Sequence, residues 1–249
     1  NALRDTAHSQ TVGRNVKLKM RLDNKELFDF FKSLEIEVLY HANTTQTSIT
    51  YLNQNGLLSR GAVESLGLNQ TAQSSDDIDK VLDVWNDVFL DTTDLHTYFS
   101  RQNYYGPILF EFDVSLIENT EYEIWITKNN PIYWKKETPM EDRYFQSVAE
   151  LRDNWKYYSR QKMMVTIRKN SSPILFESVR RVLVDDPRVT LTNENIHLFN
   201  ETVKLIKENV PDGHILKGKF KTRECGYCWC RDNYLNQVGV PDLKRLFLS

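Results

Sequence analysis

Helical and strand-like segments follow one another along these 249 residues at irregular intervals. Apolar residues three and four apart predict helices at 24–34, 148–158 and 193–210, whereas alternating or continuous apolar runs predict strands at 107–114 and 180–186. Regularly spaced βαβ units, which would build a doubly wound parallel sheet, are missing from this pattern. We therefore expect an α+β fold, in which helices flank mixed or antiparallel sheets.

The predicted segments divide the chain into three regions. Residues 1–34 form a polar arm and a first helix, residues 35–208 carry nearly all of the predicted strands, and residues 209–249 form a Cys-containing tail. The length is sufficient for one large domain with appendages. We expect the central region to be that domain.

Charge and hydropathy exclude some classes of protein. The chain has 32 basic and 34 acidic residues, so it is not a globally basic nucleic-acid binder, although this balance does not exclude a local basic patch. Crossing a membrane takes about 20 apolar residues in a row, and we find no such run. The three cysteines cluster in one stretch, unlike a secreted disulfide scaffold, and no signal-peptide pattern is visible. We expect a cytoplasmic protein.

One stretch, EVLYHANTTQTSITYLNQNGLLSRG at 37–61, suggests a site. His41 ends a strand predicted at 35–41, and small hydroxylated residues follow it. A predicted helix at 45–56, closed by Gly56, returns the chain to Leu-Leu-Ser-Arg. A single histidine is more often a structural hydrogen-bonding residue, but this compact arrangement can line one pocket. The polar segment 67–79 is either a loop that closes over a ligand or a solvated linker.

The stretch 37–61 resembles the opening of the ADP-ribosyltransferase fold, particularly the bacterial nucleic-acid-targeting toxins of the DarT kind. It is similar, more distantly, to RNA 2'-phosphotransferases and poly-ADP-ribose polymerases. In element order the resemblance extends over roughly 36–185. It implies split sheets, NAD as co-substrate, and an ADP-ribosyltransferase, hence a glycosyltransferase. It further implies a toxin or phage-defence effector that modifies a base in RNA or DNA, with an antitoxin as partner. A protein-modifying transferase and a non-catalytic nucleotide-binding module of the same fold are the alternatives.

The resemblance also implies roles for individual residues. His41 would hydrogen-bond the ribose next to nicotinamide, and Thr44 or Thr45 would hold the nicotinamide carboxamide. Arg60 would bind the pyrophosphate, because its planar guanidinium suits phosphate oxygens. The remaining implied residues are Asn43, Leu58, Phe89, Asp91 and Arg101 for NAD binding and Tyr98 for catalysis, with His96 a weaker candidate. For each of these, core packing or a surface hydrogen bond is the alternative role.

Such transferases usually carry a Glu at the mouth of a late strand, where it supports the oxocarbenium-like transition state. The corresponding stretch here, YYSRQKMMVTIRK at 157–169, offers Gln161 and no Glu. An amide can position a ribose hydroxyl but cannot act as a general base. Either the protein uses Gln161 naturally, or it is an inactivated variant, or the strand is misassigned. In the last case the carboxylates to consider are Glu141, Glu150 and Glu177.

The tail carries two further features. Cys225, Cys228 and Cys230, with His214 or Asp232, would complete a tetrahedral zinc site, although buried free thiols are the alternative. Basic and aromatic residues also alternate here and are typical of a surface for single-stranded nucleic acid, or of an ordinary charged face. These residues are Lys217, Lys219, Lys221, Arg223, Phe220, Tyr227 and Trp229.

Overall fold

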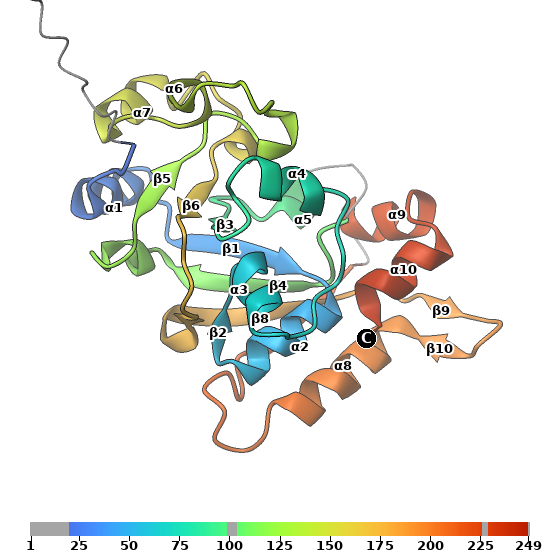
Figure 1. Cartoon of the computed structure of the whole chain (residues 1–249). Helices are drawn as coiled ribbons and strands as arrows, with labels where there is room; N and C mark the ends of the chain where they lie inside the picture. Colours follow the sequence, from blue (N-terminus) through green and yellow to red (C-terminus); the bar gives the residue numbers. More distant parts are fainter. Residues whose placement is uncertain (1–19, 99–103, 226–228, 249) are drawn as a thin grey trace, which may run out of the picture.

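The computed structural model describes residues 20–98, 104–225 and 229–248, and it shows two main sheets (Figure 1). The larger sheet has the strand order β1-β4-β8-β11; β1, β4 and β8 are antiparallel neighbours, and β11 is parallel to β8. The smaller sheet, β3-β6-β5, is antiparallel. The strands are β1 (Val38–Asn43), β3 (Val88–Leu90), β4 (Ile108–Asp113), β5 (Ile124–Ile126), β6 (Val165–Ile167), β8 (Val179–Asp186) and β11 (Phe220–Glu224). The expected α+β class with mixed and antiparallel sheets is confirmed.

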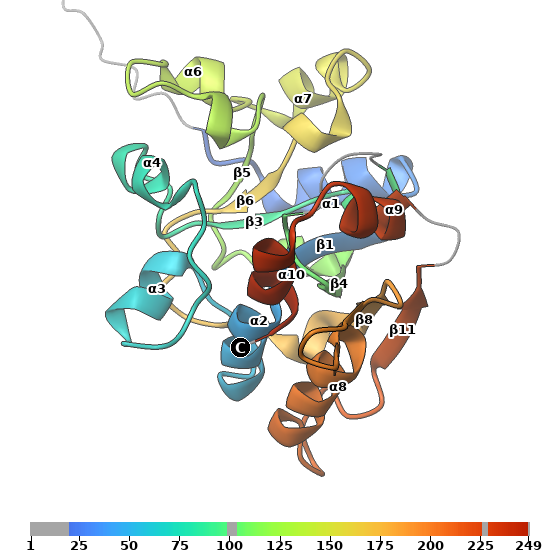
Figure 2. The ribbon, with the colours of Figure 1, turned by 90° about the vertical axis from the view of Figure 1, so that its right-hand side faces the viewer.

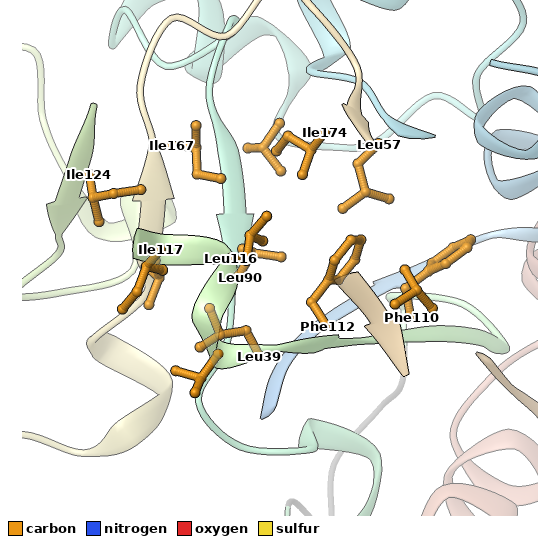
Figure 3. Packing of buried hydrophobic residues seen from close by; sticks show 14 of the residues in the cluster. Leu39, Leu57, Leu90, Phe110, Phe112, Leu116, Ile117, Ile124, Ile167 and Ile174 are labelled. Atoms are coloured by element: carbon orange, nitrogen blue, oxygen red, sulfur yellow. The ribbon is translucent and has the colours of Figure 1, made fainter. Parts of the chain in front are cut away.

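The two sheets meet where β1 lies beside β3. Tyr40 and Asp91 form a bridge there, with two backbone hydrogen bonds of 2.8 Å each. Apolar side chains from both sheets pack against one another next to this junction, among them Leu39, Leu90 and Phe112, which are fully buried (Figure 3). The main core therefore holds the two sheets together as one unit.

The first helix, α1 (Asn24–Ser33), packs on this core through Leu27, Phe30 and Phe31. Its N-cap is Asp23, whose side chain accepts from the Glu26 amide at 2.8 Å. Asn24 is buried and donates to the carbonyl of Ile117 at 2.8 Å. The helix is therefore fixed by its apolar face and by a buried amide.

Two short pairs of strands complete the sheets. β2 (Gly56–Leu57) pairs with β7 (Ile174–Leu175), and β9 (Thr190–Leu191) pairs with β10 (Ile196–His197). The helix predicted at 45–56 is shorter: α2 covers Thr45–Asn53, and Gly56 begins β2. A Cβ at Gly56 would lie 2.7 Å from the Ile174 carbonyl oxygen, so the glycine permits close strand pairing and does not cap the helix.

Other predicted boundaries also shift because local turns compete with the regular pattern. The helix predicted at 148–158 ends at Asn154, and the one predicted from 193 begins at Leu198, after the β9–β10 hairpin. The helices not yet introduced are α3 (Arg60–Ser65), α4 (Asp76–Val81), α5 (Leu95–Tyr98), α6 (Met140–Arg143), α7 (Val148–Asn154), α8 (Leu198–Asn209), α9 (Trp229–Asn236) and α10 (Val240–Phe247). Short 3₁₀ turns cover Val114–Glu118, Pro131–Tyr133, Arg160–Lys162 and Phe176–Ser178.

The C-terminal part has a small core of its own. Helix α10 packs against α2 and α8, whereas α9 packs against α5 (Figure 2). The buried side chains of α9 and α10, including Tyr234, Leu246 and Phe247, form a second apolar cluster with Leu198 of α8. In the part of the chain that the structure describes, we find no helix long and apolar enough to span a membrane.

Candidate functional site

A cavity of about 990 Å³ opens beside the junction of β1 and β3. Its walls come from these strands, from α3, from the segments 72–75 and 130–133, and from α10. Several of the residues predicted from the sequence line it together, and they come from segments far apart along the chain. These residues are His41, Asn43, Leu58, Arg60, Phe89, Asp91 and Gln161.

His41 connects the two sheets through its ring. The Nδ1 of His41 lies 2.9 Å from the carbonyl oxygen of Phe89 on β3. The side-chain amide nitrogen of Asn43, Nδ2, lies 3.4 Å from the Nε2 of His41. A carbonyl oxygen only accepts, so Nδ1 is the protonated nitrogen, and Nε2 of the neutral ring is an acceptor. Burial lowers the pKa of His41, which keeps the ring neutral near pH 7. The site thus holds a neutral imidazole in one tautomer.

Thr44 and Thr45 have structural roles. The Thr44 hydroxyl caps α2 by accepting from the Thr47 amide and forms a 2.6 Å hydrogen bond with the Thr71 hydroxyl. The Thr45 hydroxyl is 3.2 Å from that of Thr202 on α8. Both threonines are fully buried, and neither is among the described residues that line the cavity. The structure does not bring them to the position that the resemblance implies.

Arg60 lies at the start of α3, with its guanidinium against the ring of Trp85. Its Nη2 donates to the Asp76 carboxylate at 2.8 Å and to the Thr71 carbonyl at 3.0 Å. Its Nε and Nη1 are buried and have no hydrogen-bond partner among the described residues. Because buried donors are normally paired, these two can accommodate an anion in the cavity.

Four aspartates and no glutamate are found among the described residues of the cavity wall: Asp79, Asp87, Asp91 and Asp242. Burial raises the pKa of Asp79, and it raises the pKa of Asp87 to about 6 despite an ion pair with Arg168. The alternative carboxylates Glu141, Glu150 and Glu177 are not among these lining residues. Glu150 pairs instead with Lys128. Gln161, in the 3₁₀ turn before β6, does reach the cavity.

Some lining residues could not be found from the sequence. Trp85, Tyr133, Gln237 and Arg245 reach the cavity from connecting segments and from the tail, where no local pattern marks them. Of the residues that the resemblance implies, Arg101 lies outside the described residues, and so does the side chain of Tyr98. His96 is buried elsewhere, with its Nδ1 2.8 Å from a carboxylate oxygen of Asp185.

The cysteine stretch differs from the expected ligand set. Cys225 and Cys230 are fully buried, with their sulfurs 3.0 Å apart, and they lie together with Asp185 so that the three ligand atoms are within 4.8 Å of one another. His214 is elsewhere: its Nε2 donates to the Leu52 carbonyl at 3.0 Å and its Nδ1 accepts from the Leu216 amide at 3.1 Å. Cys228 lies outside the described residues.

The expected basic and aromatic surface of the tail is reduced. Arg223 is engaged in ion pairs with Asp94 and Asp185, at 2.6 and 2.9 Å. The Lys219 ammonium donates to the Val179 carbonyl, and Phe220 packs against the main core. Trp229 is exposed, whereas Tyr227 lies outside the described residues. Arg223 is therefore used inside the protein and is not part of a nucleic-acid surface.

Comparison with known proteins gives likenesses in fold only. No family model matches the sequence, and no curated protein matches it significantly. Among solved structures, the chain is similar to Thermus sp. 2.9 DarT in complex with ADP-ribosylated ssDNA, at 11% sequence identity and a TM-score of 0.45, covering 70% of this chain and 90% of that one. It is also similar to Thermosipho africanus DarTG in complex with ADP-ribose, at 11% identity and a TM-score of 0.38, covering 60% of this chain and 44% of that one.

Proposed function

We propose that the cavity binds NAD and that the protein is an NAD-dependent ADP-ribosyltransferase. The observation that carries this proposal is His41, which lines the cavity with Nδ1 bound to the Phe89 carbonyl and with Nε2 an acceptor whose contact with the Asn43 side-chain amide, at 3.4 Å, is long enough for a ligand hydroxyl to replace. A ribose hydroxyl is a suitable donor for Nε2. The cavity volume, about 990 Å³, is at the upper end of the range for small-molecule sites, which suits a dinucleotide.

The other parts of NAD find matching groups in the same cavity. The two unpaired donors of Arg60 can bind the pyrophosphate, and the ring of Phe89 offers an apolar surface for nicotinamide or adenine. Transfer breaks the bond between ribose C1 and nicotinamide, which leaves as a neutral base with the bonding electrons. The acceptor then bonds to C1 and loses a proton. Positive charge develops on the ribose in between, as in glycoside cleavage.

The proposed acceptor is a base in a nucleic acid, and the proposed role is that of a toxin or defence effector with a protein antitoxin. Both rest on the resemblance of 37–61 to nucleic-acid-targeting toxins. A cytoplasmic location is part of the same proposal.

A second function, a nucleotide-binding module without transferase activity, is favoured by one observation. The described wall of the cavity has Gln161 and four aspartates, but no glutamate to support the oxocarbenium-like state. Binding needs only His41, Arg60 and the shape of the cavity. The two functions therefore share the same NAD site and differ in whether the glycosidic bond is broken.

One experiment separates the two. The full chain is titrated with NAD by calorimetry, then incubated with NAD and separate pools of RNA, DNA and protein, and each pool is analysed by mass spectrometry. We expect NAD binding and an added mass of one ADP-ribose in a nucleic-acid pool, both reduced in His41→Ala. Binding without any added mass would support the module, labelling of protein alone would identify a protein-modifying transferase, and no binding would contradict both functions.

A further inference from the structure

The strongest group of reactive side chains outside the cavity lies at the base of α9. We propose that Asp185, Cys225 and Cys230 bind one zinc ion and that this ion anchors α9 and α10 against the rest of the protein. The three residues come from the end of β8, from the residue after β11, and from the first turn of α9. A single ion would therefore join three elements.

The ligand atoms are arranged closely enough for one ion. They lie within 4.8 Å of one another, and all three residues are fully buried. Zinc takes sulfur at about 2.3 Å and carboxylate oxygen at about 2.0–2.2 Å in tetrahedral sites, so two bound sulfurs stand about 3.8 Å apart. The sulfurs of Cys225 and Cys230 are 3.0 Å apart, and admitting the ion requires them to separate by about 0.8 Å.

The Asp185 carboxylate supplies a second, independent observation. Its Oδ2 accepts from the Tyr234 hydroxyl at 2.8 Å, which orients the group. Its Oδ1 is buried and forms no hydrogen bond with any described residue, although it forms an ion pair with Arg223 Nε at 2.9 Å. Carboxylates that ligate a metal are commonly hydrogen-bonded to outer partners, as Asp185 is to Tyr234.

The charge of the site also permits a divalent ion. When Zn²⁺ binds, the two thiols become thiolates and release two protons. The total charge of the site therefore does not change. Asp185 shares the one guanidinium of Arg223 with Asp94, at 2.9 and 2.6 Å, and His96 Nδ1 lies 2.8 Å from Oδ2 of Asp185. The ion therefore adds no uncompensated charge to this buried region.

The ion would act on the cavity through the tail. The apolar cluster that holds α9 and α10 is small, and both thiols belong to it. Gln237, Asp242 and Arg245, which follow or lie on these helices, form part of the cavity wall. Anchoring α9 at its first turn would hold this wall in place. This consequence, unlike zinc binding itself, rests on the proposed function of the cavity.

The test is elemental analysis of the full chain, purified without chelators or metal-affinity resin. We expect about one equivalent of zinc, lost in Cys225→Ser and Cys230→Ser. His214→Ala is the matched control, because His214 bonds the Leu52 carbonyl and should leave the zinc content unchanged. Removing zinc with a chelator should lower the melting temperature, and zinc but not magnesium should restore it.

Metal-free wild-type protein would overturn the proposal, whether both thiols can be alkylated after denaturation or mass analysis shows a Cys225–Cys230 disulfide. Zinc that is retained in both serine variants would overturn it as well. Since zinc content is measured without NAD, its failure is distinguishable from failure of the proposed function. If zinc is bound but NAD affinity is unchanged after its removal, the anchoring of the cavity wall is wrong and the metal site stands.

Discussion

At the scale of single residues, titration of the His41 ring should make the proposed NAD binding dependent on pH. The pKa of His41 is lowered by burial, so the ring is neutral above that value and protonated below it. Protonation converts Nε2 from an acceptor into a donor. We expect NAD affinity, measured by calorimetry, to be highest near pH 7–8 and to fall about 10-fold in acid, the approximate value of one hydrogen bond.

The variant His41→Ala controls for other groups that titrate in the cavity. Asp79 and Asp87 both have raised pKa values, about 6 for Asp87, and they gain protons as the pH falls. In His41→Ala their contribution is retained and that of the imidazole is lost. We expect this variant to bind weakly at both pH values, with a flatter profile than the wild type. Equal pH profiles for the two proteins would show that the aspartates, and not His41, cause the pH dependence of binding.

Substitutions of Gln161 test whether the protein transfers ADP-ribose or only binds NAD. It lines the cavity, but it offers no negative charge to an oxocarbenium-like state. Losing one preorganised electrostatic contact of this kind costs about 100- to 1000-fold in rate. If the chain is an inactivated form, Gln161→Glu should raise ADP-ribose transfer by about that factor. If glutamine is the natural residue, Gln161→Glu should change the rate far less, and Gln161→Ala should abolish transfer. Equal rates for all three proteins would place the catalytic group elsewhere.

At the scale of elements, the connection before β4 supports the end of β1. Gly106 has a φ of 115°, and a Cβ there would lie 2.3 Å from the backbone carbonyl of Asn43. Gly213 has a φ of 93°, with nothing within 4 Å of its Cβ position. Both alanine variants carry backbone strain of about 1–3 kcal/mol, but only Gly106→Ala pushes on β1 beside His41. We expect NAD affinity to fall in Gly106→Ala and to be unchanged in Gly213→Ala.

Denaturation in urea completes this comparison. The free energy of unfolding should decrease in both variants and more in Gly106→Ala, because that chain must also displace Asn43. A Gly106→Ala variant with the stability and NAD affinity of Gly213→Ala would mean that β1 adjusts at no cost. The close approach of this loop would then have no part in shaping the site.

Local elements were predictable from sequence, and long-range pairings were not. The stretch 37–61 indicates the strand that carries His41 and the return to Arg60, because strand, helix and turn there are adjacent in the chain, but the predicted strand end is wrong: β1 extends to Asn43, and His41 lies inside it. The burial of Thr44 against Thr71 depends on a segment 27 residues away. The parallel pairing of β11 with β8, which brings Asp185 to the cysteines, is likewise invisible to local periodicity. His214 is close to the cysteines in sequence, but its ring bonds the Leu52 carbonyl and the Leu216 amide, and no local pattern indicates this.

At the scale of the whole molecule, the cavity is bounded by both sheets, by α3 and by α10. A dinucleotide bound there should therefore stabilise the whole folded protein against unfolding. A ligand at 100 times its Kd stabilises the folded state by about 2.7 kcal/mol, and each kcal/mol raises the melting temperature of a chain of this size by about 2–4 °C. We expect NAD at that concentration to raise the melting temperature by about 5–10 °C, as measured by calorimetry. The same NAD concentration should give a much smaller rise in His41→Ala, because mass action acts only through the bound fraction. A rise of equal size in both proteins would place the NAD site away from His41, whereas no rise in the wild type would contradict NAD binding to the folded protein.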